Sequence, residues 1–307
     1  MAEPVAVIAV CGHEAAYGRA LDGVVDAGIS VVSSGRELFR SIAAHGRRNT
    51  ETVVVPMTLG RNPELVADTA RTLRAVPAGE RGTTMLAEPF GTAQHLVAWL
   101  RAAAGRVPET SALLVTAPSG DPFEDAELYR IAALVRRYGR SGLVEVAFTG
   151  GDPDPADGVR RCGLLGAQRV ALLPAAFALP DLPEAQTVPV DRAGPLIPAS
   201  ALRRVLGERV ADARRRWREH GDDGVAAGLT AAANHGHSHT HPPGEGHDHS
   251  HDPGHRHEHG HSHDPGRDRR HGHPHDPDHR QEHGPGPLHT HHHPSAPGAD
   301  RVIGSIA

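Results

Sequence analysis

The chain has 307 residues, a formal net charge of −5 and an aromatic content of only 3%. Its arginines form no basic stripe and its aromatic side chains are too few for base stacking, so we do not expect nucleic acid as a partner. Cys11 and Cys162 are too few for a disulfide framework. The apolar run Val5 to Cys11 is shorter than the core of a signal peptide or a membrane span. We therefore expect a cytoplasmic protein that does not associate with membranes.

Short apolar runs that end in Gly, Pro or Ser alternate with segments of helical periodicity. The predicted strands are 5–10, 29–32, 52–55, 84–87, 112–115, 143–148 and 170–173. The predicted helices are 36–44, 63–75, 93–103, 125–138, 157–165 and 199–219. This alternation is typical of an α/β fold with parallel sheets, in which ligands bind at the carboxyl ends of the strands.

The first two thirds of the chain also repeat themselves loosely. Segment 40–57 resembles 160–175, and segment 87–96 resembles 190–202, in the same order along the chain. We expect two similar α/β lobes, residues 1–107 and 108–220, that face one cleft. A tail over residues 221–307 follows them.

The predicted tail holds 21 of the 25 histidines, between His235 and His293. Its composition of Gly, Pro, Asp, Ser and Arg cannot bury a core, so we expect it to be disordered. Imidazoles two residues apart can surround one cation, and neutral imidazole suits Ni²⁺, Co²⁺, Zn²⁺ and copper. The tail is thus predicted to bind divalent metal, although repeat expansion in a GC-rich gene is an alternative origin. The predicted ligands are His235, His237, His239, His241, His247, His249, His251, His255, His257, His259, His261 and His263.

Three residues of the body are candidates for the chemistry. His13 and Glu14 follow the first predicted strand, where such folds collect ligand and catalytic groups. A histidine there can bind a metal or take a proton, or it can be an ordinary turn residue. Glu88 leaves the fourth predicted strand at the same edge and is a candidate catalytic carboxylate.

Other polar residues have structural explanations. Asn62 precedes Pro63 and is expected to cap a helix. Asp121 and Glu124 are expected to form a turn and to favour the first turn of the next helix, and His95 is expected to face solvent. The sequence has no Walker loop, dinucleotide fingerprint or hydrolase triad, so we expect no organic cofactor.

In their order, these motifs resemble the sirohydrochlorin chelatase family of the CbiX/SirB type. The resemblance covers the whole body. It rests on Gly12-His13 after a strand, the unit Gly46 to Met57, Glu88 to Gly91 before a helix, and Leu113 to Ser119 with Tyr129 beyond it. It implies a tetrapyrrole metal chelatase of two α/β lobes, either homo- or hetero-oligomeric. Such an enzyme inserts a divalent metal substrate, Co²⁺, Fe²⁺ or Ni²⁺, into sirohydrochlorin or a related tetrapyrrole.

The sequence also departs from the family pattern. His13 matches the first family histidine, but Asn62 in Gly60-Arg61-Asn62 replaces the second, and Ala117 stands where the second lobe often has a histidine. The resemblance implies that His13 is a metal ligand and proton acceptor, with Glu88, Glu14 or the tail supplying the missing group. A non-catalytic metal chaperone or storage protein on a chelatase fold is the main alternative. A subunit completed by a histidine from another chain is a third.

Overall fold

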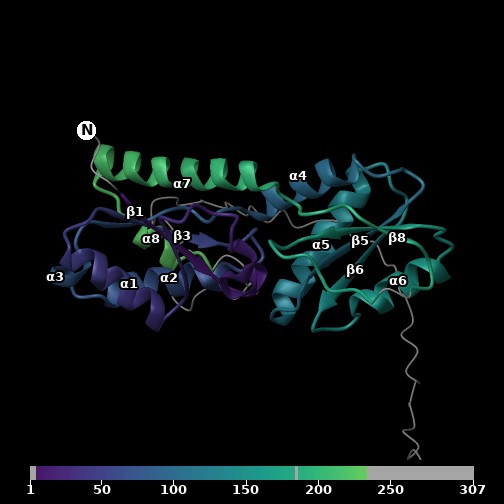
Figure 1. Ribbon diagram of the computed structural model, residues 1–307, viewed down its shortest axis with the longest axis horizontal. Helices are drawn as coiled ribbons and strands as arrows, with labels where there is room; N and C mark the ends of the chain where they lie inside the picture. The colour runs from purple at the N-terminus through teal and green to yellow at the C-terminus, as the bar shows by residue number, and fades with distance from the viewer. Residues whose placement is uncertain (1–4, 184–185, 234–307) are drawn as a thin grey trace, which may run out of the picture. The chain divides into compact units, whose positions relative to one another are not determined.

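The computed structural model describes residues 5–183 and 186–233, and these build two four-stranded parallel sheets (Figure 1). The first sheet has the order β2-β1-β3-β4 and the second the order β6-β5-β7-β8. Each sheet thus places its second, first, third and fourth strands side by side in that order. The prediction of an α/β fold with parallel sheets is confirmed. The strands are β1 (Ala6–Cys11), β2 (Ile29–Ser33), β3 (Thr52–Met57), β4 (Thr84–Leu86), β5 (Ala112–Pro118), β6 (Val144–Thr149), β7 (Val170–Pro174) and β8 (Val190–Arg192).

All seven predicted strands and all six predicted helices are found, with ends shifted by a few residues. Four elements were not predicted: β8, the 3₁₀ segment η1, α3 and α8. Within the described ranges, no helix is both long and apolar enough to cross a bilayer. The helical elements are η1 (His13–Leu21), α1 (Arg36–Arg47), α2 (Pro63–Ala75), α3 (Ala78–Arg81), α4 (Ala93–Ala104), α5 (Pro122–Tyr138), α6 (Pro155–Leu164), α7 (Ala199–His220) and α8 (Val225–Leu229).

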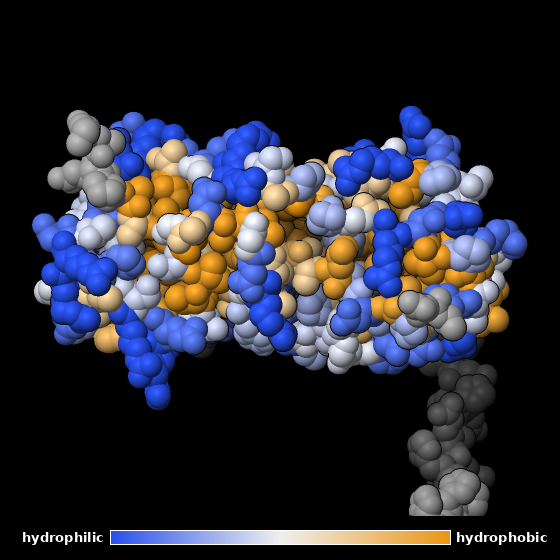
Figure 2. Space-filling view, viewed as in Figure 1, coloured by the Kyte–Doolittle hydropathy of each residue, from blue (hydrophilic) through white to orange (hydrophobic). Residues whose placement is uncertain are grey.

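The central strands are buried on both faces, as parallel sheets require. Alternation along each strand sends successive side chains to opposite faces. In β1, Ala9 and Cys11 join one apolar cluster, whereas Ile8 and Val10 join another that α1, α2 and α8 cover. This burial explains why the strands read as continuous apolar runs. The surface in Figure 2 carries apolar side chains interspersed with charged ones.

The two halves of the chain exchange a helix. α4 follows the first sheet but packs against α5 and β7, whereas α7 follows the second sheet but packs against β3 and β4, and Figure 1 shows both. Arg214 of α7 binds the carboxylate of Glu51 at 2.7 Å, just before β3. Because each half supplies a helix to the other, one apolar cluster contains residues of both sheets.

The folded part of the chain continues past residue 220, where we expected the tail to begin. The segment that leaves α7 runs along the edge of β4, where the Leu86 N–H donates to the Asp223 carbonyl oxygen at 2.7 Å. α8 then packs against α2, and Gly228 lies directly against Leu86. The described structure thus extends to Ala233, into the range 221–307 that we assigned to the tail. The predicted tail ligands His235 to His263 and the predicted disorder lie outside the described residues.

Candidate functional site

The exit of β1 is conformationally strained. The backbone leaves β1 through Gly12 and enters η1 at His13, and three consecutive residues of η1 have positive φ: Ala16 at 49°, Tyr17 at 54° and Gly18 at 100°. Non-glycine residues rarely adopt this left-handed region, and such strain concentrates at functional sites. A strained turn directly after His13 and Glu14 marks this end of the first sheet as a candidate site.

Glu14 is buried and points into the loop after β3. Its carboxylate accepts a hydrogen bond from the Thr58 hydroxyl and another from the Leu59 N–H, the latter at 3.1 Å. Burial raises the pKa of Glu14, while the Arg61 guanidinium and these hydrogen bonds act in the opposite direction. Its second oxygen, Oε1, has no hydrogen-bond partner among the described residues. One carboxylate oxygen of Glu14, a predicted metal ligand, is therefore used to bind the β3 loop.

Asn62 joins His13 to the start of α2. Its side-chain Oδ1 accepts a hydrogen bond from the Leu65 N–H at 2.8 Å, which confirms the predicted helix cap, with Pro63 in the first helical turn. Its Nδ2 lies 3.1 Å from Nδ1 of His13. Asn62 therefore caps α2 and also belongs to the candidate site, because it contacts His13 directly.

His13 also faces a carboxylate that comes from the other half of the chain. Its Nε2 lies 3.4 Å from Oε2 of Glu124 in the first turn of α5, without forming a hydrogen bond in the described structure. Burial, and secondarily the charge of Asp121, raise the pKa of Glu124 to about 7. Burial, followed by the charge of Arg61, lowers the pKa of His13. A neutral imidazole thus faces a carboxyl group that exchanges a proton near neutral pH.

Arg61 connects the β3 loop to the end of β5 and to the first turn of α5. Its side chain is fully buried, and its guanidinium donates to the carbonyl oxygens of Pro118 and Glu124 and to the Asp125 carboxylate, the last at 3.2 Å. Asp125 also accepts hydrogen bonds from Ser119 and from the Gly120 N–H. This network fixes the first turn of α5, and so the position of Glu124, relative to the β3 loop.

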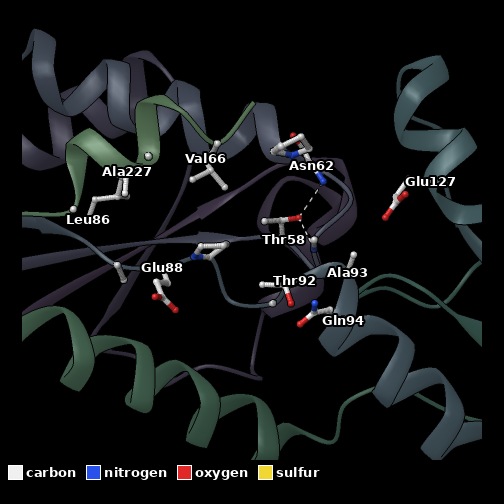
Figure 3. Close-up of a pocket in the computed structure, with 18 of the residues that line it drawn as sticks. Thr58, Asn62, Val66, Leu86, Glu88, Thr92, Ala93, Gln94, Glu127 and Ala227 are labelled. Atoms are coloured by element: carbon white, nitrogen blue, oxygen red, sulfur yellow. Dashed lines mark hydrogen bonds between the residues drawn. The ribbon is translucent and has the colours of Figure 1, made fainter. Parts of the chain in front are cut away.

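A cavity of about 680 Å³ lies beside the pair, and Figure 3 shows its walls. Asn62 and Glu127 line it, and these residues are the neighbours of His13 and Glu124: Asn62 contacts His13, and Glu127 follows Glu124 by one helical turn. Glu88 lines the same cavity. Further lining residues come from β4, from the loops after β3 and β4, from α2, α4, α5 and α7, and from the segment around α8. They are Thr58, Gly60, Pro63, Val66, Leu86, Ala87, Pro89, Gly91, Thr92, Ala93, Gln94, Arg130, Arg216, Gly224, Ala227, Gly228 and Ala231.

The predicted site residues are brought together only in part. His13 and Glu14 leave β1 side by side, but Glu14 is held by the β3 loop and His13 faces α5. Glu88 lies in the cavity wall with its side chain 63% exposed and pairs with Arg209 at 3.2 Å. No group of three or more His, Cys, Asp or Glu side chains able to hold a metal ion occurs in the part of the chain that the structure describes.

Two residues of this site were missed in the sequence. Glu124 was explained as a first-turn partner of its helix, and it does form a capping box with Asp121. Arg61 was read only as the middle residue of Gly60-Arg61-Asn62. The available signal was the position of both residues after strands β3 and β5, since the carboxyl ends of parallel strands collect functional groups. His95, in contrast, is exposed as predicted.

No protein-family model matches the chain, and a search of curated proteins finds no significant match. The class of protein is therefore defined by its fold and site alone. It is an α/β protein of two parallel sheets with a buried histidine–carboxyl pair beside a large cavity.

Proposed function

We propose that this protein is a metal chelatase that inserts a divalent metal, Co²⁺ or Fe²⁺, into sirohydrochlorin or a related tetrapyrrole. The observation that carries the proposal is the His13–Glu124 pair, whose members adjoin two residues of the cavity wall: Asn62 contacts His13, and Glu127 lies one helical turn after Glu124. Metal insertion releases two pyrrole protons, so a chelatase needs a proton acceptor that works near neutral pH. A carboxyl group whose burial raises its pKa to about 7 meets this need.

The cavity supports the proposal by its size and lining. A volume of about 680 Å³ falls in the upper half of the range of about 300–1,000 Å³ for small-molecule sites, and a tetrapyrrole is a large ligand. The lining is mainly apolar or small, which suits a flat macrocycle. Arg130 and Arg216 also line the wall, where they pair with Glu127 and Asp222, and they place positive charge near the peripheral carboxylates that such a substrate carries.

The histidine-rich segment closely follows the cavity wall in the sequence. Ala231 of the wall is only four residues before His235, so the chain cannot separate them by more than about 14 Å. We infer that this segment raises the metal concentration at the cavity. It is then a metal reservoir covalently attached to the proposed site.

The test is metal insertion into sirohydrochlorin, followed by absorbance, with Co²⁺ and with Fe²⁺. The full chain is compared with a chain that ends at Ala233, which keeps α8 in the cavity wall, and with the variants His13→Ala and Glu124→Gln. Glu109→Gln, which removes an exposed carboxylate paired with Arg140, is the matched control. We expect insertion by the full chain and the control, slower insertion at limiting metal without the tail, and a loss of about 100-fold or more in both site variants.

The absence of insertion by the full chain under all of these conditions would overturn the chelatase proposal. Metal binding that disappears with the segment after Ala233 would then favour the alternative of a metal chaperone or storage protein. The observation that favours this alternative is that the described part of the chain has no group of three side chains able to hold a metal ion. A Glu88→Ala variant tests the catalytic carboxylate that the sequence suggested. Because the ion pair of Glu88 with Arg209 is exposed, we expect the insertion rate to fall by less than about threefold.

A further inference from the structure

The hydrogen bonds around Asn62 have a fixed direction. A backbone N–H can only donate, so the group of Asn62 that lies 2.8 Å from the Leu65 nitrogen must be its carbonyl oxygen Oδ1. The amide NH₂ is then the group that lies 3.1 Å from Nδ1 of His13. Because an NH₂ group only donates, Nδ1 of His13 must accept and carries no proton. The orientation of the amide is thus set by the helix cap and does not depend on the histidine.

The consequence for His13 concerns its other nitrogen. A neutral imidazole carries one proton, so an accepting Nδ1 places that proton on Nε2. Nε2 is buried, has no hydrogen-bond partner in the described structure and lies 3.4 Å from Oε2 of Glu124. A donor therefore lies 3.4 Å from a carboxyl oxygen without the alignment that a hydrogen bond requires, and poorly aligned contacts are common in sites that tighten when substrate binds.

We propose that Asn62 is a positioning residue that holds His13 as an Nε2–H donor toward Glu124, so that the Glu124 carboxylate is the base of the site. The substrate named above comes from the proposed function, but the direction of the hydrogen bonds does not depend on it. This assignment changes the role that the sequence suggested for His13, which was metal ligand and proton acceptor.

The surroundings of His13 differ from those of a metal-binding histidine in one further respect. A ligating histidine presents the lone pair of one nitrogen to the metal and donates its other N–H to a carboxylate or a carbonyl. In this protein the second nitrogen faces the NH₂ donor of Asn62 instead. Ligation through Nε2 would require a proton on Nδ1, and that proton would point at the amide hydrogens. The arrangement therefore disfavours ligation and favours donation.

The experiment is long-range ¹H–¹⁵N NMR of the full chain, in which the ring nitrogens of His13 are identified by their loss in His13→Ala. In the wild type we expect a protonated Nε2 and a bare Nδ1. In Asn62→Asp the carboxylate still accepts from the Leu65 N–H but now also accepts from His13, so the proton moves to Nδ1. Asn49→Asp, at an exposed position after α1, is the matched control and leaves the His13 signals unchanged.

A wild-type spectrum with the proton on Nδ1 would overturn the inference, and this result needs no variant other than the His13→Ala protein that assigns the signals. An Asn62→Asp protein whose His13 signals match the wild type would overturn it as well. Both results are independent of metal insertion, so the two proposals fail separately. If insertion is observed, we expect Glu124→Gln to lower its rate by about 100-fold or more, whereas a Glu124→Gln protein with wild-type activity would exclude Glu124 as the base.

Discussion

Arg61 of the β3 loop and Asp125 of α5 form an ion pair of 3.2 Å that joins the two halves of the chain through a fully buried guanidinium. The same guanidinium donates to the carbonyl oxygens of Pro118 and Glu124. One side chain therefore binds acceptors at the end of β5 and in the first turn of α5. The position of Glu124 beside His13 depends on these hydrogen bonds.

We predict that Arg61→Ala lowers the free energy of unfolding by about 3–5 kcal/mol, because it removes the buried ion-pair partner of Asp125 and the side-chain donor to two carbonyl oxygens. Urea unfolding measures the change. Arg71→Ala is the control, since its ion pairs with Glu64 and Asp68 are exposed, and it should leave the urea unfolding curve close to that of the wild type. Equal effects of the two variants would contradict the role assigned to Arg61.

The loop that carries Arg61 and Asn62 depends on Gly60. Its φ is +103°, and a Cβ atom there would lie 2.2 Å from the backbone of Thr92 and Ala93. Gly166 has a similar φ of +94° but open space around it. We predict that Gly60→Ala destabilises the protein by about 1–3 kcal/mol more than Gly166→Ala, because only the first adds a clash to the backbone strain. Thermal unfolding of both variants checks this, and equal losses would show that the loop moves freely.

Glu124 should make stability depend on pH. Its pKa is about 7 in the folded protein and 4.5 as the ordinary value, so the folded state binds more protons between these limits. The stabilisation is complete below pH 4.5 and is lost as the pH rises through 7. We predict that the free energy of unfolding of the wild type falls relative to that of Glu124→Gln, by up to about 3 kcal/mol, from pH 4.5 to 8.

Chemical denaturation of both proteins across this pH range measures the difference. His13 acts in the opposite direction, since burial lowers its pKa, but it is present in both proteins and cancels to first order. Glu109→Gln, an exposed carboxylate, should show no such trend. Parallel pH profiles for wild type and Glu124→Gln would contradict the raised pKa.

The two cysteines should be unreactive in the folded protein. Burial raises the pKa of Cys11 to about 12 and that of Cys162 to about 11, and only the thiolate is a nucleophile. We predict no reaction with a thiol reagent at pH 8 under native conditions and reaction of both thiols in denaturant. Rapid native labelling of either cysteine would show that its strand or helix opens.

The sequence by itself determined the local structure of this protein. Short apolar runs predicted seven strands and helical periodicity predicted six helices, and the capping role of Asn62 followed from Pro63 after it. These features depend on neighbouring residues, which the sequence displays directly. It did not predict α8, whose Gly and Ala residues carry no periodic signal and which packs against α2 and β4.

Only the tertiary structure decided which groups meet at the site. His13, Asn62 and Glu124 come from three separate segments, which are η1, the β3 loop and α5, and their distances depend on the helix exchange and on the buried Arg61. The sequence predicted Glu124 as a dipole partner in the first turn of its helix, and it does lie in the first turn of α5. Its raised pKa and its position facing His13 arise from burial between the two halves of the chain. Burial of this kind is a property of packing between distant segments, so no local pattern predicts it.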